Sequence, residues 1–139
     1  MDLDLSETQL MTRKMVRDFV ERDIIPDSMA YDESQKFPAH WATKMGERGL
    51  LGVFVPEKYG GSNMGYVSYI IAVEELARVD GSQAATIAAG NSLGISPIYY
   101  YGTEEQRRKF LPRLARGEIV GCFGLTEPDH GSDPGSMVT

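Results

Sequence analysis

The hydrophobic residues at the start of the chain recur at helical intervals. Between Ser6 and about Ile25 they come in pairs three or four positions apart, which places them along one stripe. Ser6 and Gln9 have the spacing of a capping box, and Pro26 fits a stop signal. This pattern predicts a long first helix that ends at Pro26.

A second, shorter helix is predicted in the next apolar segment. Pro38 suits a first helical turn, and the helix should run through Trp41 and Met45 to Gly49. An apolar extended segment and a glycine-containing loop should follow, because Gly60 and its neighbours do not support a packed helix.

A third helix is predicted over about Tyr66 to Arg78. Its periodicity places four apolar side chains inward and two carboxylates nearer the polar side. The inward residues are Val67, Ile70, Ile71 and Leu76, and the polar ones are Glu74 and Glu75.

The segment "QAATIAAGNSLGISPIYYY" is rich in small residues and offers little side-chain volume for core packing. Ala85, Ala89 and Leu93 are spaced four apart, so they share one helix face. Two interpretations remain open: the small side chains line a cavity, or they let a neighbouring helix pack closely. Tyr99 to Tyr101 are expected to wedge the end of the helix into the core.

The last third of the chain predicts one more helix and then a change of structure. Thr103 is a good N-cap, Glu104 and Glu105 suit a helix N-terminus, and Pro112 marks a kink. "IVGCFGLTE" (119–127) reads as a strand. The expected fold is an all-α helical bundle with a first strand of a following β-domain near the C-terminus.

Composition narrows the class of protein. The 139 residues are 42% hydrophobic and 24% charged, typical of one globular domain. A net charge of -6 argues against nucleic-acid and anionic-membrane surfaces, which need a basic face. The single Cys122 suits a reducing compartment, and the sequence shows neither a membrane-spanning run nor a signal peptide. An intracellular protein is expected.

The stretch "FGLTEPDHGSDPGS" (123–136) carries the candidate chemistry. At Gly131 and Ser132 a bare backbone allows a ligand to approach closely. The hydroxyls of Thr126 and Ser132 and nearby backbone amides could bind an anion or the polar edge of a ring. An ordinary surface loop of the same composition remains the alternative.

From Gly124 to Ser136 this stretch resembles the flavin-loop signature of the acyl-CoA dehydrogenase family, departing at His130 where the family has a small residue. "FVPEKYGGSNMGYVSYIIAVEELARVD" and "GNSLGISPIYYYGTEEQRRKFLPRLARGE" are similar to its preceding segments, so the resemblance covers essentially the whole chain. It implies an N-terminal helical domain over 1–118 and the start of the middle β-domain over 119–139.

The resemblance implies FAD-dependent removal of two hydrogens across the α,β carbons of an acyl-CoA. The residues it places on FAD are Phe123, Leu125, Thr126, Gly131 and Ser132. Those it places on the acyl-CoA substrate are Ala85, Ala89, Leu93 and Ser132. The catalytic base is expected beyond Thr139, so these residues alone should not turn over, and no metal is expected.

The resemblance also implies an electron-transfer flavoprotein as acceptor, a homo-oligomer (tetramer or dimer), and a location in the cytoplasm or the mitochondrial matrix. Nucleic-acid and membrane partners are not expected. Two other function classes stay open: an acyl-CoA oxidase-like flavoenzyme, and a non-catalytic helical interaction module.

Two acidic residues and both histidines are not expected to be catalytic. Glu127 could act as a base but fits better as a carboxylate that holds the turn through backbone hydrogen bonds, and Asp133 fits loop ordering. His40 and His130 lack the spacing of metal ligands.

Ala84 bears on the choice of substrate. "CFGLTEP" and "GSDP" also resemble the glutaryl-CoA dehydrogenase branch, which carries an arginine for the distal carboxylate at the position of Ala84. No positive residue lies between Arg78 and Arg107, and a buried carboxylate without a counter-charge is disfavoured. Poor use of dicarboxylyl-CoA is therefore expected.

Overall fold

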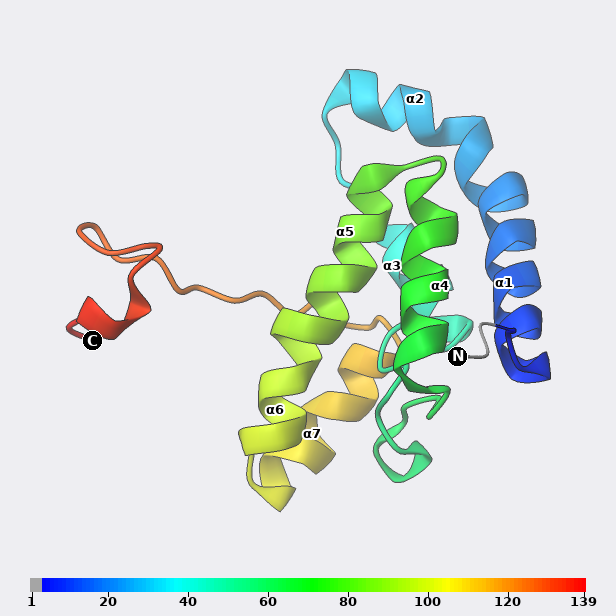
Figure 1. Ribbon diagram of the computed structural model, residues 1–139. Coiled ribbons are helices and arrows are strands. Elements are labelled where there is room, and N and C mark those ends of the chain that lie inside the picture. The colour runs from blue at the N-terminus through cyan, green and yellow to red at the C-terminus, as the bar shows by residue number, and fades with distance from the viewer. Residues whose placement is uncertain (1–3) are drawn as a thin grey trace.

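Figure 1 shows the computed structural model, which describes residues 4–139 as a helical bundle followed by an extended C-terminal segment. The described range contains no strand, so the prediction of an all-α body is confirmed. Residues 1–3, on which the expected absence of a signal peptide partly rests, lie outside this range. The helices are α1 (Glu7–Phe19), α2 (Ile25–Ser34), α3 (Ala39–Glu47), α4 (Gly65–Ala77), α5 (Gly81–Ala89), α6 (Ser96–Tyr101) and α7 (Glu104–Ala115).

Helix α1 begins with the expected capping box. The Ser6 amide donates to Gln9 Oε1 (2.9 Å), and the Gln9 amide donates to Ser6 Oγ (3.4 Å). The prediction that Pro26 stops this helix is wrong. A π-helical turn, Val20–Ile24, carries the chain into α2, and Pro26 stands in the first turn of α2. Proline is tolerated there because a first-turn amide has no helical partner.

The second predicted helix is α3, which starts after Pro38 and ends two residues before Gly49. Gly49 has a φ of 69°, a left-handed conformation that turns the chain away from the helix. Trp41 and Met45 are buried in a core shared by five of the helices and the loop after α3. The largest buried apolar side chains are Trp41, Phe19, Ile24, Met45, Leu50, Leu76, Ile87, Ile95 and Leu111.

Helix α4 matches the predicted range but not all of the predicted faces. Ile71 and Leu76 are buried as expected, whereas Val67 and Ile70 are 51% and 59% exposed. Glu75, expected on the polar side, is 3% exposed. The helix is apolar on more than one side, so periodicity does not determine which side meets α1. Arg17 on α1 pairs with the Glu75 carboxylate and fixes that side.

The end of α6 also differs from expectation. Tyr99 packs against the core, but Tyr100 and Tyr101 are 49% and 90% exposed, so they do not wedge the helix into the core. Tyr100 instead stacks on Phe54, with ring centroids 6.4 Å apart and planes 10° apart, and its hydroxyl contacts that of Tyr66. The hydrogen bond with Tyr100 raises the pKa of Tyr66 to about 12.

Helix α7 starts with a second capping box: the Thr103 amide donates to Gln106 Oε1 (2.8 Å), and the Gln106 amide donates to Thr103 Oγ1 (3.2 Å). The helix continues through Pro112 to Ala115. Arg108 on its outer side pairs with Glu104 (2.7 Å), which is the behaviour of a solvated charged face.

The segment after α7 corrects the prediction of a strand over 119–127. Within the described residues this stretch is extended but pairs with no other segment. Figure 1 shows it leaving the bundle and folding back on itself well beyond α5. A β-strand requires a hydrogen-bonded neighbour, and residues 4–139 provide none here.

None of the helices in residues 4–139 is long and apolar enough to cross a membrane. The same residues contain no group of three or more His, Cys, Asp or Glu side chains placed to hold a metal ion.

Candidate functional site

The small-residue stripe predicted on α5 is present on the surface of the bundle. Ala85, Ala89 and Leu93 are all exposed, and the Leu93 side chain retains 46% of its accessible area. The stripe is therefore not covered by a neighbouring helix within the described residues. Close packing of the stripe against another helix is therefore not seen among residues 4–139, and the cavity interpretation remains a prediction.

Ala84 lies on a different side of α5 from the stripe. It is 5% exposed and belongs to the hydrophobic core. Alanine at position 84 carries no charge, and no lysine, arginine or histidine between Arg78 and Arg107 could replace an arginine there. The expected lack of a carboxylate partner therefore remains a prediction.

A buried asparagine fixes the stripe to the rest of the domain. Asn91 stands in the π-helical turn Gly90–Ile95 that follows α5, and it is fully buried. Its Oδ1 accepts hydrogen bonds from the amides of Gly52 (2.8 Å) and Val53 (3.2 Å). Its Nδ2 donates to the carbonyls of Leu50 (2.9 Å) and Ile87 (2.9 Å).

The hydrophobic pattern does not single out Asn91. The available signal is that Asn91 is the one amide side chain between Ile87 and Tyr101, where the other residues are alanine, glycine, serine, proline, tyrosine and aliphatic residues. Four hydrogen bonds from one buried side chain satisfy all of its polar capacity, so Asn91 holds the loop after α3 against the C-terminal part of α5. It positions the surface that carries the stripe.

The expected flavin contacts lie in the C-terminal segment and face solvent. Phe123 and Leu125 are 49% and 43% exposed, and Thr126, Gly131 and Ser132 are exposed as well. A Cβ added at Gly131 would lie 3.5 Å from Thr126 Cγ2, so these two residues are neighbours. Among residues 4–139, neither the Thr126 nor the Ser132 hydroxyl takes part in a hydrogen bond.

A tight turn brings Thr126 and Gly131 together. The Glu127 amide donates to the His130 carbonyl (2.9 Å) and the His130 amide donates to the Glu127 carbonyl (3.4 Å), with Pro128 and Asp129 at the tip. His130, the departure from the family pattern, is half-buried beside this turn. Its backbone closes the turn, so the larger side chain is accommodated without loss of the loop's hydrogen bonds.

The Glu127 carboxylate ties the two ends of the loop together. Its oxygens accept from the amides of Val138 (3.0 Å) and Thr139 (3.0 Å). Hydrogen bonds from Thr139 and Val138 lower the pKa of Glu127, which makes it a weaker proton acceptor. This geometry agrees with a carboxylate that organises the loop. Asp133 does the same over a shorter range by accepting from Ser136 Oγ (2.5 Å).

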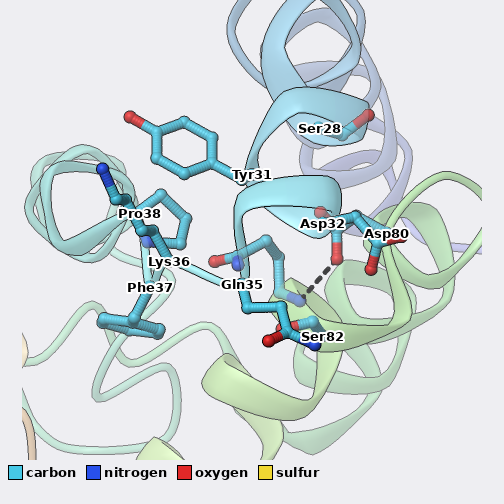
Figure 2. Close-up of a pocket in the computed structure, with 10 residues that line it drawn as sticks. Ser28, Tyr31, Asp32, Gln35, Lys36, Phe37, Pro38, Asp80 and Ser82 are labelled. Carbon is cyan, nitrogen blue, oxygen red and sulfur yellow. Dashed lines mark hydrogen bonds between the residues drawn. The ribbon is translucent and has the colours of Figure 1, made fainter.

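A hollow of about 340 Å³ between the end of α2 and the start of α5 contains none of the expected site residues. Figure 2 shows Asp32 and Asp80 on one side of it, with Ser82 below them. Lys36 is the only cation among its lining residues. Two carboxylates against one ammonium group make this hollow unfavourable for a pyrophosphate, so it is not a candidate for the cofactor site.

Comparison with known proteins identifies the class to which this fold and loop belong. The family model for the acyl-CoA dehydrogenase N-terminal domain matches residues 6–118. The chain therefore belongs to the acyl-CoA dehydrogenase family.

Individual relatives agree with this assignment. The chain is 47% identical over 139 residues to the probable acyl-CoA dehydrogenase YngJ of Bacillus subtilis, covering all of this chain and 37% of that protein. A chain in the structure of the electron transferring flavoprotein of Acidaminococcus fermentans superposes with a TM-score of 0.93 at 43% identity, covering 98% of this chain and 36% of that one. The FADH2 complex of a glutaryl-CoA dehydrogenase from Mycobacterium smegmatis gives a TM-score of 0.90 at 38% identity, covering 96% and 34%.

The chain spans just over a third of the length of these relatives. The family and the fold of the helical domain are therefore established, while the activity concerns a longer protein.

Proposed function

We propose that the full-length protein is a flavoenzyme that removes two hydrogens across the α,β carbons of an acyl-CoA thioester. The observation that carries this proposal is the loop 123–136, in which the unused hydroxyls of Thr126 and Ser132 and the bare Gly131 flank a turn closed by backbone hydrogen bonds. The Glu127 and Asp133 carboxylates order the residues around this turn. The FADH2 complex of a structural relative supports FAD as the cofactor.

The described residues fit a flavin. Phe123 and Leu125 provide exposed apolar surface for a ring, and the Thr126 and Ser132 hydroxyls are free to bind its polar edge or a phosphate oxygen. Gly131 leaves the backbone accessible between them. When bound, FAD would accept a hydride from the β carbon, and hydrogen bonds to its polar edge would stabilise the negative charge that develops there.

The stripe on α5 is assigned to the acyl chain. Ala85 and Ala89 leave more depth than larger residues would, and Leu93 adds apolar contact. A medium, longer or bulky acyl group is therefore favoured over the smallest, with Ser132 near the CoA arm. The proton acceptor for the α carbon would come from residues after Thr139.

The division of the chain follows from the same assignment. Residues 1–118 would form the N-terminal helical domain, and 119–139 would start the middle β-domain, whose later strands would give 119–127 the pairing that it lacks here. A homo-oligomer, an electron-transfer flavoprotein as acceptor, and a reducing compartment complete the proposal. The Acidaminococcus fermentans structure supports the choice of acceptor.

The test uses the full-length protein. Purified protein should carry a flavin absorbance band that is bleached on anaerobic addition of an acyl-CoA, because the substrate reduces the bound flavin. Electron-transfer flavoprotein should restore the band, whereas restoration mainly by oxygen would show an oxidase. A full-length protein that binds no flavin and shows no bleaching would instead be a helical interaction module.

A further inference from the structure

Two glycines touch where residues 119–121, which leave the bundle after α7, cross the π-helical turn between α5 and α6. They are Gly94, in that turn, and Gly121, and we call their contact the crossing. A Cβ added at Gly94 would lie 3.1 Å from Gly121 Cα, and a Cβ added at Gly121 would lie 2.9 Å from Gly94 Cα. Both contacts are to backbone atoms, which cannot rotate away as a flexible side chain can. By contrast, a Cβ on Gly81, in α5, would have open space around it.

Ile119 and Gly121 still contact the helical bundle. Ile119 packs against the core, and a Cβ on Gly121 would also approach Leu114 Cδ2 at 3.3 Å. The crevice under residues 119–121 retains only about 10 Å³ of space. Val120 points outward and is 55% exposed, and from Cys122 to Thr126 every residue is exposed. The crossing is therefore the last fixed point before the loop.

The crossing also lies between the two proposed binding surfaces. Gly94 directly follows Leu93, the last residue of the acyl stripe, and Gly121 precedes the first expected flavin contact, Phe123, by two residues. We infer that the Gly94–Gly121 contact is a positioning contact that sets the placement of the flavin loop relative to the acyl stripe. This inference rests on the proposed function, since it concerns the distance between substrate and cofactor.

The expected consequence of a methyl group at this contact is a slower reaction with the cofactor still bound. Alanine at either position forces the two backbones apart by several tenths of an ångström or more. Reaction rates fall by on the order of 100-fold when reacting groups are misplaced by about 1 Å. Gly121→Ala should therefore slow flavin bleaching by about 10- to 100-fold, and Gly94→Ala, whose contact is longer, by less.

The experiment compares full-length wild type with Gly121→Ala, Gly94→Ala and the matched control Gly81→Ala. FAD content, the temperature of unfolding and the rate of bleaching at saturating acyl-CoA are measured for each. The inference predicts stoichiometric FAD in all four and slower bleaching only in the two crossing variants. Normal bleaching in both crossing variants, even with a lowered unfolding temperature, would show that the contact serves stability alone and would overturn the inference.

Two other outcomes are also decisive. If Gly121→Ala does not fold, Gly94→Ala decides: a slowing of about threefold or more with FAD retained supports the inference, and a wild-type rate overturns it. If wild type binds flavin but no acyl-CoA bleaches it, the proposed function fails and the inference fails with it. If acyl-CoA bleaches the wild-type flavin and both crossing variants bleach at the wild-type rate, the proposed function is supported and only the inference is overturned.

Discussion

Arg17 of α1 donates two hydrogen bonds to the buried carboxylate of Glu75 on α4, from Nε at 3.0 Å and from Nη2 at 2.7 Å. Arg78 adds a third contact at 2.7 Å, and Arg13 lies 4.0 Å away. The Glu75 side chain is only 4% exposed, whereas its arginine partners are roughly half exposed. The carboxylate is therefore the desolvated member of the cluster, and its burial depends on these partners.

Replacing this carboxylate should weaken the packing of α1 on α4. Glu75→Gln keeps the size of the side chain but removes its charge, so we expect the free energy of unfolding to fall by about 1–3 kcal/mol. Glu74→Gln is the matched control, because Glu74 is the exposed neighbour on the same helix, and it should change stability by less than about 0.5 kcal/mol. Urea unfolding of both variants measures this, and equal losses would contradict the role of Glu75.

The same cluster predicts a loss of stability in acid. The hydrogen bond from Arg17 is the main reason why the pKa of Glu75 lies below its ordinary value of 4.5. A carboxyl group with a lowered folded-state pKa stabilises the fold above the unfolded-state value, and this contribution disappears as pH falls through the folded-state value. Stability should therefore decline below about pH 4.5, and less steeply in Glu75→Gln than in wild type. Parallel pH curves for the two proteins would exclude Glu75 as the cause.

Local patterns in the sequence predict the approximate positions of α1, α3, α4, α5 and α7, because capping residues and apolar spacing are properties of neighbours along the chain. They do not predict α2 (Ile25–Ser34) as a helix or the π-helical turn that separates α5 from α6. They do not predict that Glu75 is buried or that Val67 and Ile70 are exposed, since those depend on which face of α4 meets α1. Pro26 misleads for a similar reason: proline is compatible both with a helix end and with a first turn after a π-helical turn.

The features of the candidate site also separate into those that local sequence predicts and those that depend on residues far apart in the chain. The shared face of Ala85, Ala89 and Leu93 follows from spacing alone, and the structure shows that this face is open. The strand over 119–127 has the right composition but lacks a partner, because pairing depends on residues far away in the chain. The Gly94–Gly121 contact joins positions 27 residues apart and leaves no local signal.

The Asn91 side chain should contribute more to the free energy of unfolding than most polar side chains do. Asn91→Ala removes four hydrogen bonds and leaves the buried amide of Gly52 and carbonyl of Leu50 without partners, so we expect a loss of about 2–4 kcal/mol. Ser92→Ala is the control, since Ser92 is exposed and makes one local bond to the Ala88 carbonyl (2.7 Å). Chemical denaturation compares them. A cost for Asn91→Ala no larger than that for Ser92→Ala would show that the four bonds are not cooperative.

Dicarboxylyl substrates should be poor for the full-length enzyme. The segment between Arg78 and Arg107, which carries the acyl stripe, offers no cation, so a distal carboxylate would be desolvated there without a counter-charge. Activity on glutaryl-CoA should be at least about tenfold below activity on a neutral acyl-CoA of similar length, since tenfold corresponds to only about 1.4 kcal/mol. Side-by-side steady-state measurements test this, and comparable rates would mean that a cation from another part of the protein reaches the site.

Enlarging the middle of the stripe should shorten the range of acceptable acyl chains. Ala89→Leu adds bulk to the exposed stripe beside Leu93, and the steric loss should reach only those substrates whose chains extend to that depth. We expect kcat/KM for long-chain acyl-CoA to fall by about 10- to 200-fold, the scale on which one hydrophobic group discriminates in a pocket, while short-chain activity stays near wild type. Ala77→Leu, the same exchange at an exposed position of α4, controls for general effects of a surface leucine. Uniform loss over all chain lengths would place the stripe outside the acyl cavity and favour a purely structural role for α5.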